Sequence, residues 1–172
     1  DKDHKERKEY IPMNYREIVH RFNKMNLLHR IYAGRAAQHH GLYFGQLAIL
    51  EYIIKNDNCT QRELSEAIGV SPPSIATSIK RMSKAGLIEK SEDDIDSRIN
   101  RISITSSGRE LAEKCRMDFD KVDERMFQGF TPLECNILTG YLDRLIANLS
   151  QGEFEDKNFF SLIEEEKLLR EK

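Results

Sequence analysis

The chain has 172 residues, of which 39% are hydrophobic and 33% are charged, and its formal net charge is −2 at pH 7. This composition indicates a helix-rich protein of one domain, or of one domain with an extended helical part. It contains no apolar run of transmembrane length and no signal-peptide pattern, so we expect a cytoplasmic protein with no membrane partner. Its three cysteines are too scattered for a disulfide framework or a Cys-x-x-Cys zinc site, and we expect no cofactor.

A charged segment followed by two helices is predicted for the first third of the chain. Residues 1–12 lack periodicity, which indicates a disordered arm or an artificial remnant ahead of Met13. A long helix is predicted from Tyr15 to His39, because apolar residues recur along it at helical spacing. Gly41 ends this pattern, and a second helix is predicted from about Tyr43 to Lys55.

Two short helices joined by a glycine turn are predicted next. Thr60 and Glu63 form a capping box, which predicts a helix that starts directly after Thr60. Gly69 comes just past this helix, where a positive φ angle costs glycine nothing. Ser71 is predicted to cap the following helix, and Pro72 suits its first turn because no N–H is needed there. This arrangement is a helix-turn-helix motif.

The outward face of the second short helix is rich in short hydrogen-bonding groups. Such groups, with a cation, are suited to contacts with phosphates and base edges. Residues 60–90 contain five cations and three acids, a local excess of positive charge within an acidic chain. The alternative is an ordinary helical hairpin with a polar solvent face. The outward residues are Ser71, Ser74, Thr77, Ser78 and Arg81.

A β-hairpin is predicted after the two short helices. Leu87–Glu89 and Arg101–Ile104 have strand patterns, and the charged stretch Lys90–Asn100 between them is predicted to be a loop. Three stretches carry a family resemblance, namely Gly86–Ile88, Asp96–Thr105 and Gly108. Through them the chain resembles the MarR family of transcriptional regulators. The resemblance covers about residues 15–149 and implies a fold that is mainly α with a small β-wing, namely a winged helix-turn-helix domain flanked by long helices that form a dimerisation domain.

The family resemblance also implies a function. It implies a homodimer that binds a double-stranded, palindromic DNA operator as a ligand-responsive repressor, with one helix of each motif in a major groove and each wing on the minor groove or backbone. Asp96 and Arg98 share a face of extended backbone, so Asp96 is expected to orient one wing arginine while the other contacts DNA. The candidate DNA contacts are Thr60, Gln61, Arg62, Ser71, Pro72, Pro73, Ser74, Thr77, Ser78, Lys80, Arg81, Asp96, Arg98 and Arg101.

Long helices are predicted again after the wing. Apolar residues recur at steps of three and four from Ser106 to about Gln128, and a second capping box at Thr131 opens a helix to about Leu149. The tail is acidic and ends in a short helix. We therefore predict an N-terminal dimerisation helix in residues 13–42, the DNA-binding domain in 43–105, C-terminal dimerisation helices in 106–150, and an acidic helical tail in 151–172.

Binding of a small effector is a further expectation from the resemblance. In relatives, a small molecule, often an aromatic acid, binds between the dimerisation helices and the winged helix. The resemblance thus implies a small aromatic or anionic effector. The candidate lining residues are His29, Tyr32, Tyr43 and Phe44, whose alternative role is as ordinary core aromatics and one satisfied histidine.

The sequence allows three alternative functions: metal sensing, redox sensing and binding to protein only. His20, His29, His39 and His40 suggest a metal sensor, but the helix after the wing lacks histidine and adjacent residues on a helix point in different directions. A redox sensor would use Cys59, although no cations surround it in the sequence. A winged helix that binds only protein would have an acidic or apolar outer face. No phosphate-binding loop or nucleophile motif indicates an enzyme.

Overall fold

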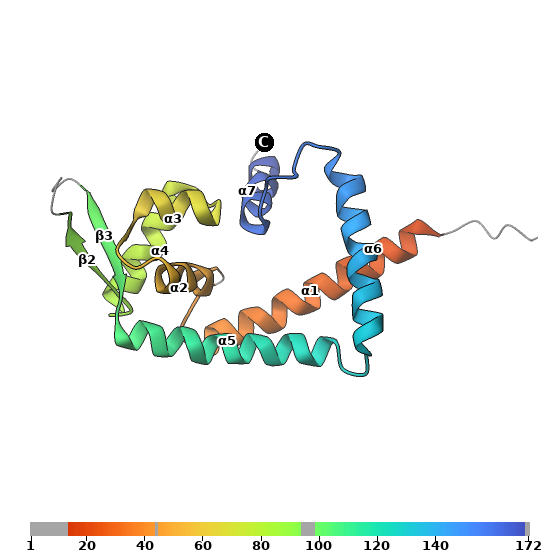
Figure 1. Cartoon of the computed structure of the whole chain (residues 1–172), viewed down its shortest axis with the longest axis horizontal. Coiled ribbons are helices and arrows are strands. Elements are labelled where there is room, and N and C mark those ends of the chain that lie inside the picture. Colours follow the sequence, from red (N-terminus) through yellow and green to blue (C-terminus); the bar gives the residue numbers. More distant parts are fainter. Residues whose placement is uncertain (1–13, 44, 94–98, 171–172) are drawn as a thin grey trace, which may run out of the picture.

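A computed structural model of the chain describes residues 14–43, 45–93 and 99–170. The fold is mainly helical, with one small sheet (Figure 1). Among the described residues, no helix has the length and apolar character needed to cross a bilayer. The elements in order are α1 (Tyr15–His39), α2 (Gln46–Lys55), β1 (Cys59–Thr60), α3 (Gln61–Ile68), α4 (Pro72–Lys84), β2 (Ile88–Glu92), β3 (Asn100–Ile104), α5 (Ser106–Met126), α6 (Pro132–Ser150) and α7 (Phe159–Arg170).

The sheet has three antiparallel strands in the order β1-β3-β2. β3 is central, and its Ile102 pairs with Cys59 of β1 on one side and Lys90 of β2 on the other. β1 was not predicted. The prediction of a loop from Lys90 was also wrong, because β2 continues to Glu92. The polar residues at its end are exposed, as an edge strand allows, while β3 supplies their backbone partners.

The capping predictions are mostly confirmed. The N–H of Glu63 donates to the hydroxyl of Thr60 (3.1 Å) and the N–H of Thr60 donates to the Glu63 carboxylate (2.7 Å), as a capping box requires. Gly69 has φ 72°, in the left-handed region. Ser71 occupies the N-cap position of α4, but the prediction that its side chain caps the helix was wrong, because its hydroxyl donates to Ser74 Oγ (2.9 Å) instead.

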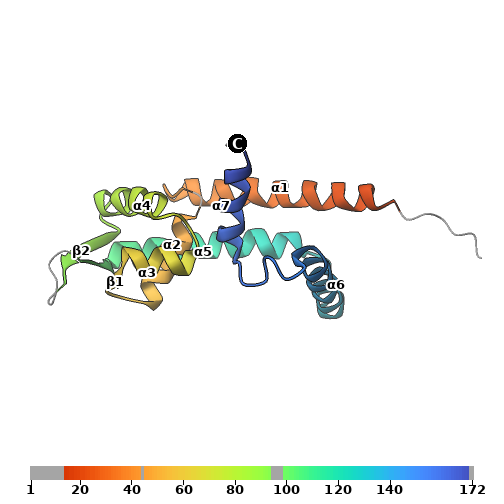
Figure 2. The ribbon, with the colours of Figure 1, turned by 90° about the horizontal axis from the view of Figure 1, so that it is seen from above.

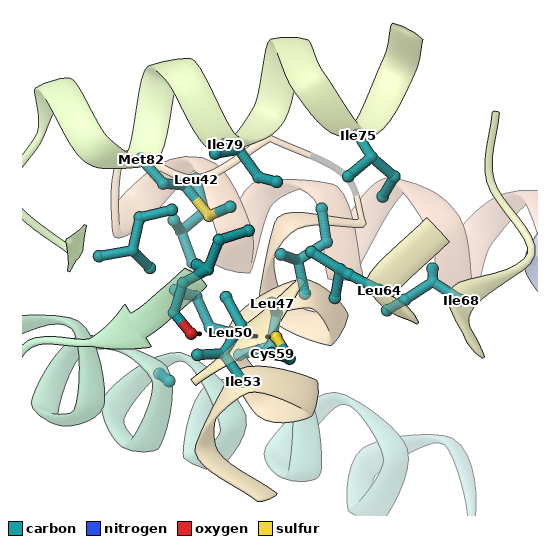
Figure 3. Close-up of a cluster of buried hydrophobic side chains, with 14 of the residues drawn as sticks. Leu42, Leu47, Leu50, Ile53, Cys59, Leu64, Ile68, Ile75, Ile79 and Met82 are labelled. Carbon is teal, nitrogen blue, oxygen red and sulfur yellow. Dashed lines mark hydrogen bonds between the residues drawn. The ribbon is translucent and has the colours of Figure 1, made fainter. Parts of the chain in front are cut away.

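We call the part from α2 to β3 the head, and it has its own core. Figure 3 shows side chains from α2, α3 and α4 converging on one cluster. Ile75, Ile79 and Met82 are the inner face of α4, and they meet Leu50 and Leu64. All five are essentially inaccessible to water, so the two short helices are held as a unit by burial of apolar surface.

The long helices are packed very differently. α1 and α5 lie against each other beside the head, and α6 leaves the far end of α5 (Figure 1). α1 buries only Ala33 and Ala37, and α6 buries no residue at all within the described chain. Apolar side chains therefore remain exposed along both helices, among them Ile18, Val19, Leu27, Leu28, Ile137, Tyr141, Leu145, Ile146 and Leu149.

The start of α5 is joined closely to the end of the motif. The hydroxyls of Thr105 and Ser107 both donate to the carbonyl oxygen of Gly86 (2.7 and 3.0 Å). The N–H of Thr105 donates to Leu87 O (3.1 Å), and a Cβ on Gly108 would overlap with that same oxygen. Gly108 therefore allows the helix to approach the strand base this closely.

The tail returns to the head. In both views α7 stands between the head and α6 (Figures 1 and 2). The side-chain amide of Asn158 donates to Ala67 O at the end of α3 (3.1 Å) and its oxygen accepts from the N–H of Ser161 (3.0 Å). Phe160 is partly buried against the core of the head. The predicted tail helix is therefore confirmed, and it packs on its own subunit.

Candidate nucleic-acid interface

The outer face of α4 is polar and cationic. Burial of Ile75, Ile79 and Met82 fixes which side of the helix is inside, and the opposite side is exposed. No acid occurs in α4, so its charged groups are all cations. A polar face with positive charge and no acid favours contact with a polyanion. The exposed residues of this face are Pro72, Pro73, Thr77, Lys80, Arg81 and Lys84.

Ser74 and Ser78 lie on a flank of α4. Both are half-buried, and they line a small cavity of about 130 Å³ together with Phe160 and Ile163 of α7. Their side chains therefore face the tail on one side. The hydroxyl of Thr77, on the exposed face, donates to the carbonyl oxygen of Pro73 (3.0 Å), which leaves the hydroxyl oxygen as an acceptor.

The start of α3 joins the same surface. The side chain of Gln61 donates to Pro72 O (3.4 Å), which connects the first turns of α3 and α4. Arg62 is exposed and its Nε donates to Glu66 (2.7 Å). The side chain of Thr60 is engaged in the capping box. The structure thus places Gln61, at the start of α3, beside Pro72 in the first turn of α4.

The wing is described only in part. Asp96 and Arg98 lie outside the described residues, so the expected pairing between them has no structural account. Arg101 donates through Nε to Asp93 (2.6 Å), and its guanidinium also approaches Asn58 O (3.4 Å). The Asp93 hydrogen bond raises the pKa of Arg101. Asp93 is therefore a partner of this wing arginine, as expected if the wing cations are neutralised by neighbouring acids.

The comparisons with known proteins agree with this geometry. Residues 46–89 match the family model for winged helix-turn-helix DNA-binding domains. A MarR-like transcription regulator from Bacillus cereus superposes with a TM-score of 0.66 at 21% identity, covering 80% of this chain and 99% of that chain. The MepR–DNA complex of S. aureus has a TM-score of 0.64 at 19% identity, covering 76% and 96%.

The chain has a winged helix-turn-helix fold like those of the MarR-like regulator and of MepR. The HTH-type transcriptional regulator YwaE of Bacillus subtilis is 34% identical over 88 residues, which are 51% of this chain and 52% of YwaE. The match thus spans about half of the length of that relative. By sequence and by fold, the similarity is to winged-helix transcriptional regulators.

Two cavities lie beside the long helices α1 and α5. The first, about 440 Å³, lies between α1 and α5 and is lined by His29, Tyr32 and the side chains around them. The second, about 550 Å³, also includes His29, and adds Tyr43 from the α1–α2 connection and Phe160 from α7. Phe44 lies outside the described residues. His29 is not free in either cavity, since its Nε2 bonds Asp123 (2.8 Å).

The histidines at the end of α1 converge, contrary to the sequence argument. Two neighbours point in different directions when both are on a helix, but α1 ends at His39 and His40 lies beyond it. His40 Nε2 lies 2.9 Å and His39 Nδ1 3.8 Å from Asp118 Oδ2 on α5. Lys121 donates to the other carboxylate oxygen (2.8 Å), and the hydrogen bonds from Lys121 and His40 lower the pKa of Asp118. His39, His40 and Asp118 thus bring three possible metal-ligand atoms within 4.8 Å of one another, and Lys121 binds the same carboxylate.

Two of the three cysteines, Cys59 and Cys115, are poorly suited to redox sensing. Cys59 and Cys115 are both buried, and burial raises the pKa of each thiol above its ordinary value. Since the thiolate is the reactive form, a raised pKa disfavours oxidation at these sites. The Cys59 thiol instead points to Ile102 O at 4.0 Å within the sheet.

Proposed function

We propose that this protein is a sequence-specific DNA-binding transcriptional regulator that acts as a homodimer on a palindromic operator. The observation that carries the proposal is the outer face of α4, which is exposed, polar and free of acids. A helix of 13 residues is about 20 Å long, and the major groove of B-DNA is wide enough to admit it. Thr77, Lys80 and Arg81 would then meet base edges and phosphates.

Dimerisation is supported by the exposed apolar side chains of α1 and α6. A helix such as α6, which carries Ile137, Tyr141 and Leu145 without burying any residue in the subunit, needs another surface to cover it. A two-fold dimer is the commonest solution for a soluble protein. It would present two α4 helices to successive major grooves, and so require a palindromic site.

An effector that relieves repression is the second part of the proposal. The two cavities beside α1 and α5, the second of which also reaches the head, have the size of small-ligand sites and are lined mainly by apolar side chains. Cations lie close to the aromatic ring of Tyr32, with the Arg125 guanidinium carbon 5.2 Å from its centroid. This combination favours a small aromatic molecule with an anionic group.

The test is to recover fragments of genomic DNA with the purified protein and to sequence them. We expect a palindromic motif to be enriched, and its neighbouring genes to indicate the effector. Enrichment of no motif would contradict the proposal and would favour a winged helix that binds only protein.

A matched pair of variants tests the role of α4. Thr77 and Thr139 are both exposed, and each hydroxyl donates to the carbonyl four residues earlier, on α4 and α6 respectively. Thr77→Glu places an acid against the phosphates and should weaken binding to the recovered motif at least tenfold, whereas Thr139→Glu should not. Circular dichroism should show both variants folded. Equal binding by the two variants would contradict the placement of α4 in the major groove.

A further inference from the structure

A side chain outside the helix-turn-helix motif contacts Arg81. The guanidinium carbon of Arg81 lies 4.7 Å from the centroid of the Tyr43 ring, which is within the range of a cation–π contact. Tyr43 belongs to the connection between α1 and α2, whereas Arg81 lies in the last turns of α4. Within the described chain no carboxylate forms an ion pair with Arg81, so the ring is its observed partner.

The backbone that carries the ring is held firmly. The N–H of Tyr43 donates to the side-chain oxygen of Gln46 (2.8 Å), and the N–H of Gln46 donates back to Tyr43 O (3.0 Å). Gln46 is buried, with 3% of its surface exposed, and the preceding Leu42 is equally buried. The ring itself is 61% exposed, so a fixed support presents one face of an accessible ring to Arg81.

This geometry restricts Arg81 without using up its donors. A free arginine on a helix surface populates many rotamers, and ordering it on DNA costs side-chain entropy. Stacking engages the flat face of the guanidinium, while the N–H donors point outward in its plane. The donors therefore stay available to phosphate oxygens or to the O6 and N7 atoms of a guanine.

We propose that Tyr43 is a positioning residue for DNA binding, which holds the Arg81 guanidinium in the orientation that meets DNA. The inference rests on the proposed function, because it requires Arg81 to contact DNA. Tyr43 also lines the 550 Å³ cavity, so a single side chain connects the wall of that cavity to the reading helix. Sequence reasoning assigned Tyr43 to a ligand and Arg81 to DNA, and did not connect them.

A double-mutant cycle tests the proposal. The probe is a short duplex that the wild-type full chain selects from a random-sequence pool, titrated with Tyr43→Ala, Arg81→Ala and the double variant. An exposed cation–π contact corresponds to roughly a two- to fivefold change in affinity, so we expect Tyr43→Ala to weaken binding by that factor. In the Arg81→Ala background the same change should have no effect, because its target is gone.

Conservative variants separate positioning from folding. Tyr43→Phe keeps the ring and should bind like the wild type, whereas Tyr43→Leu keeps the apolar bulk and should bind like Tyr43→Ala. Thermal melting should be alike for all variants.

The outcomes distinguish the two proposals. If the wild-type protein selects no sequence, the proposed function itself is contradicted. If it selects one and Tyr43→Ala binds as tightly, or loses as much affinity with Arg81 already removed, the positioning role is contradicted while DNA binding stands.

Discussion

The head and the long helices contrast in how they use apolar residues. In the head, Leu50, Leu64, Ile75 and Ile79 are completely inaccessible to water, and the chain between α2 and β3 closes its own core. In α6, Leu149 is 83% exposed and no residue is buried. Both regions have apolar residues at helical spacing, but only the head buries them within a single subunit.

This contrast teaches that apolar periodicity specifies a buried face but not which molecule buries it. The head can be understood from one chain, because its hydrophobic residues meet one another. The long helices can be understood only with a second surface, since exposed apolar stripes of this length promote association. The following predictions test that division, beginning with the largest effect.

Breaking the surface of α6 should have the largest effect. Burial of a leucine side chain contributes about 1.5–3 kcal/mol, and in a two-fold dimer Leu145 counts twice, so Leu145→Asp should weaken dimerisation by about 3–6 kcal/mol or more. Sedimentation at low micromolar concentration should then show one chain instead of two. Asn136→Asp adds the same charge at an exposed polar position of α6 and should leave the mass unchanged. A wild-type protein of single-chain mass would end the dimer hypothesis.

A core substitution in the head should act on folding, not on assembly. Ile79→Ala removes part of a side chain that is completely buried, and such changes cost about 2–5 kcal/mol of unfolding free energy. Urea unfolding monitored by circular dichroism measures the loss. Ile146→Ala, at a position 61% exposed in the subunit, is the matched change in α6 and should alter stability only in a concentration-dependent way. Similar losses of unfolding free energy in both variants, independent of protein concentration, would contradict the difference between the head and α6.

A smaller effect is expected at the capping box of α3. Thr60→Ala should cost the head about 1 kcal/mol, because an N-terminal N–H of the helix loses its acceptor. Hydrogen bonds from Thr60 also lower the pKa of Glu63 below its ordinary value of 4.5. A carboxyl whose pKa is lowered by folding stabilises the fold above its unfolded pKa, and this contribution is lost as the pH falls through the folded pKa.

The pH dependence gives this prediction a second measurement. Unfolding of wild type and Thr60→Ala should be compared from pH 7 to pH 3. The backbone N–H of Thr60 lowers the Glu63 pKa most and remains in the variant, but the contribution of the Thr60 hydroxyl is lost, so the variant should lose less stability over the acid range. Thr131→Ala is the matched variant, because it removes the corresponding hydroxyl from the capping box of α6. Unequal acid sensitivity between wild type and variant is required, and parallel curves would contradict the role of Glu63.

Local signals predicted most of the fold. The limits of α1, the two capping boxes and the glycine turn follow from neighbouring residues, since capping chemistry and helical periodicity act within a few positions. β1 was missed because two residues, Cys59 and Thr60, form a strand only by pairing with β3 far along the chain. The strand extension to Glu92 has the same cause.

The candidate site was predictable in part. The spacing of Ile75, Ile79 and Met82 correctly predicted the buried side of α4 and the exposure of Thr77 and Arg81. The prediction that Ser71, Ser74 and Ser78 face outward was wrong, because all three are half-buried, and Ser74 and Ser78 face the distant tail helix α7. The contact of Arg81 with Tyr43 and that of Arg101 with Asp93 depend on how distant segments fold together, and no local pattern encodes them. The approach of His40 to Asp118 depends on where α1 ends.

The hydrogen bonds from Thr105 and Ser107 to Gly86 O couple the orientation of α5 to that of the head. The helix has 21 residues and is about 32 Å long, and its first turn is fastened to the base of the wing. At Gly108 the first turn of α5 is in close contact with the backbone of Leu87 at the base of the wing. We therefore expect the head to change orientation together with the helix. A tilt of about 5° at the far end of such a helix displaces its tip by about 3 Å, close to the rise of one base pair. Under the proposed function, a small change in direction where α5 meets α1 would therefore shift the head along the DNA axis by about one base pair.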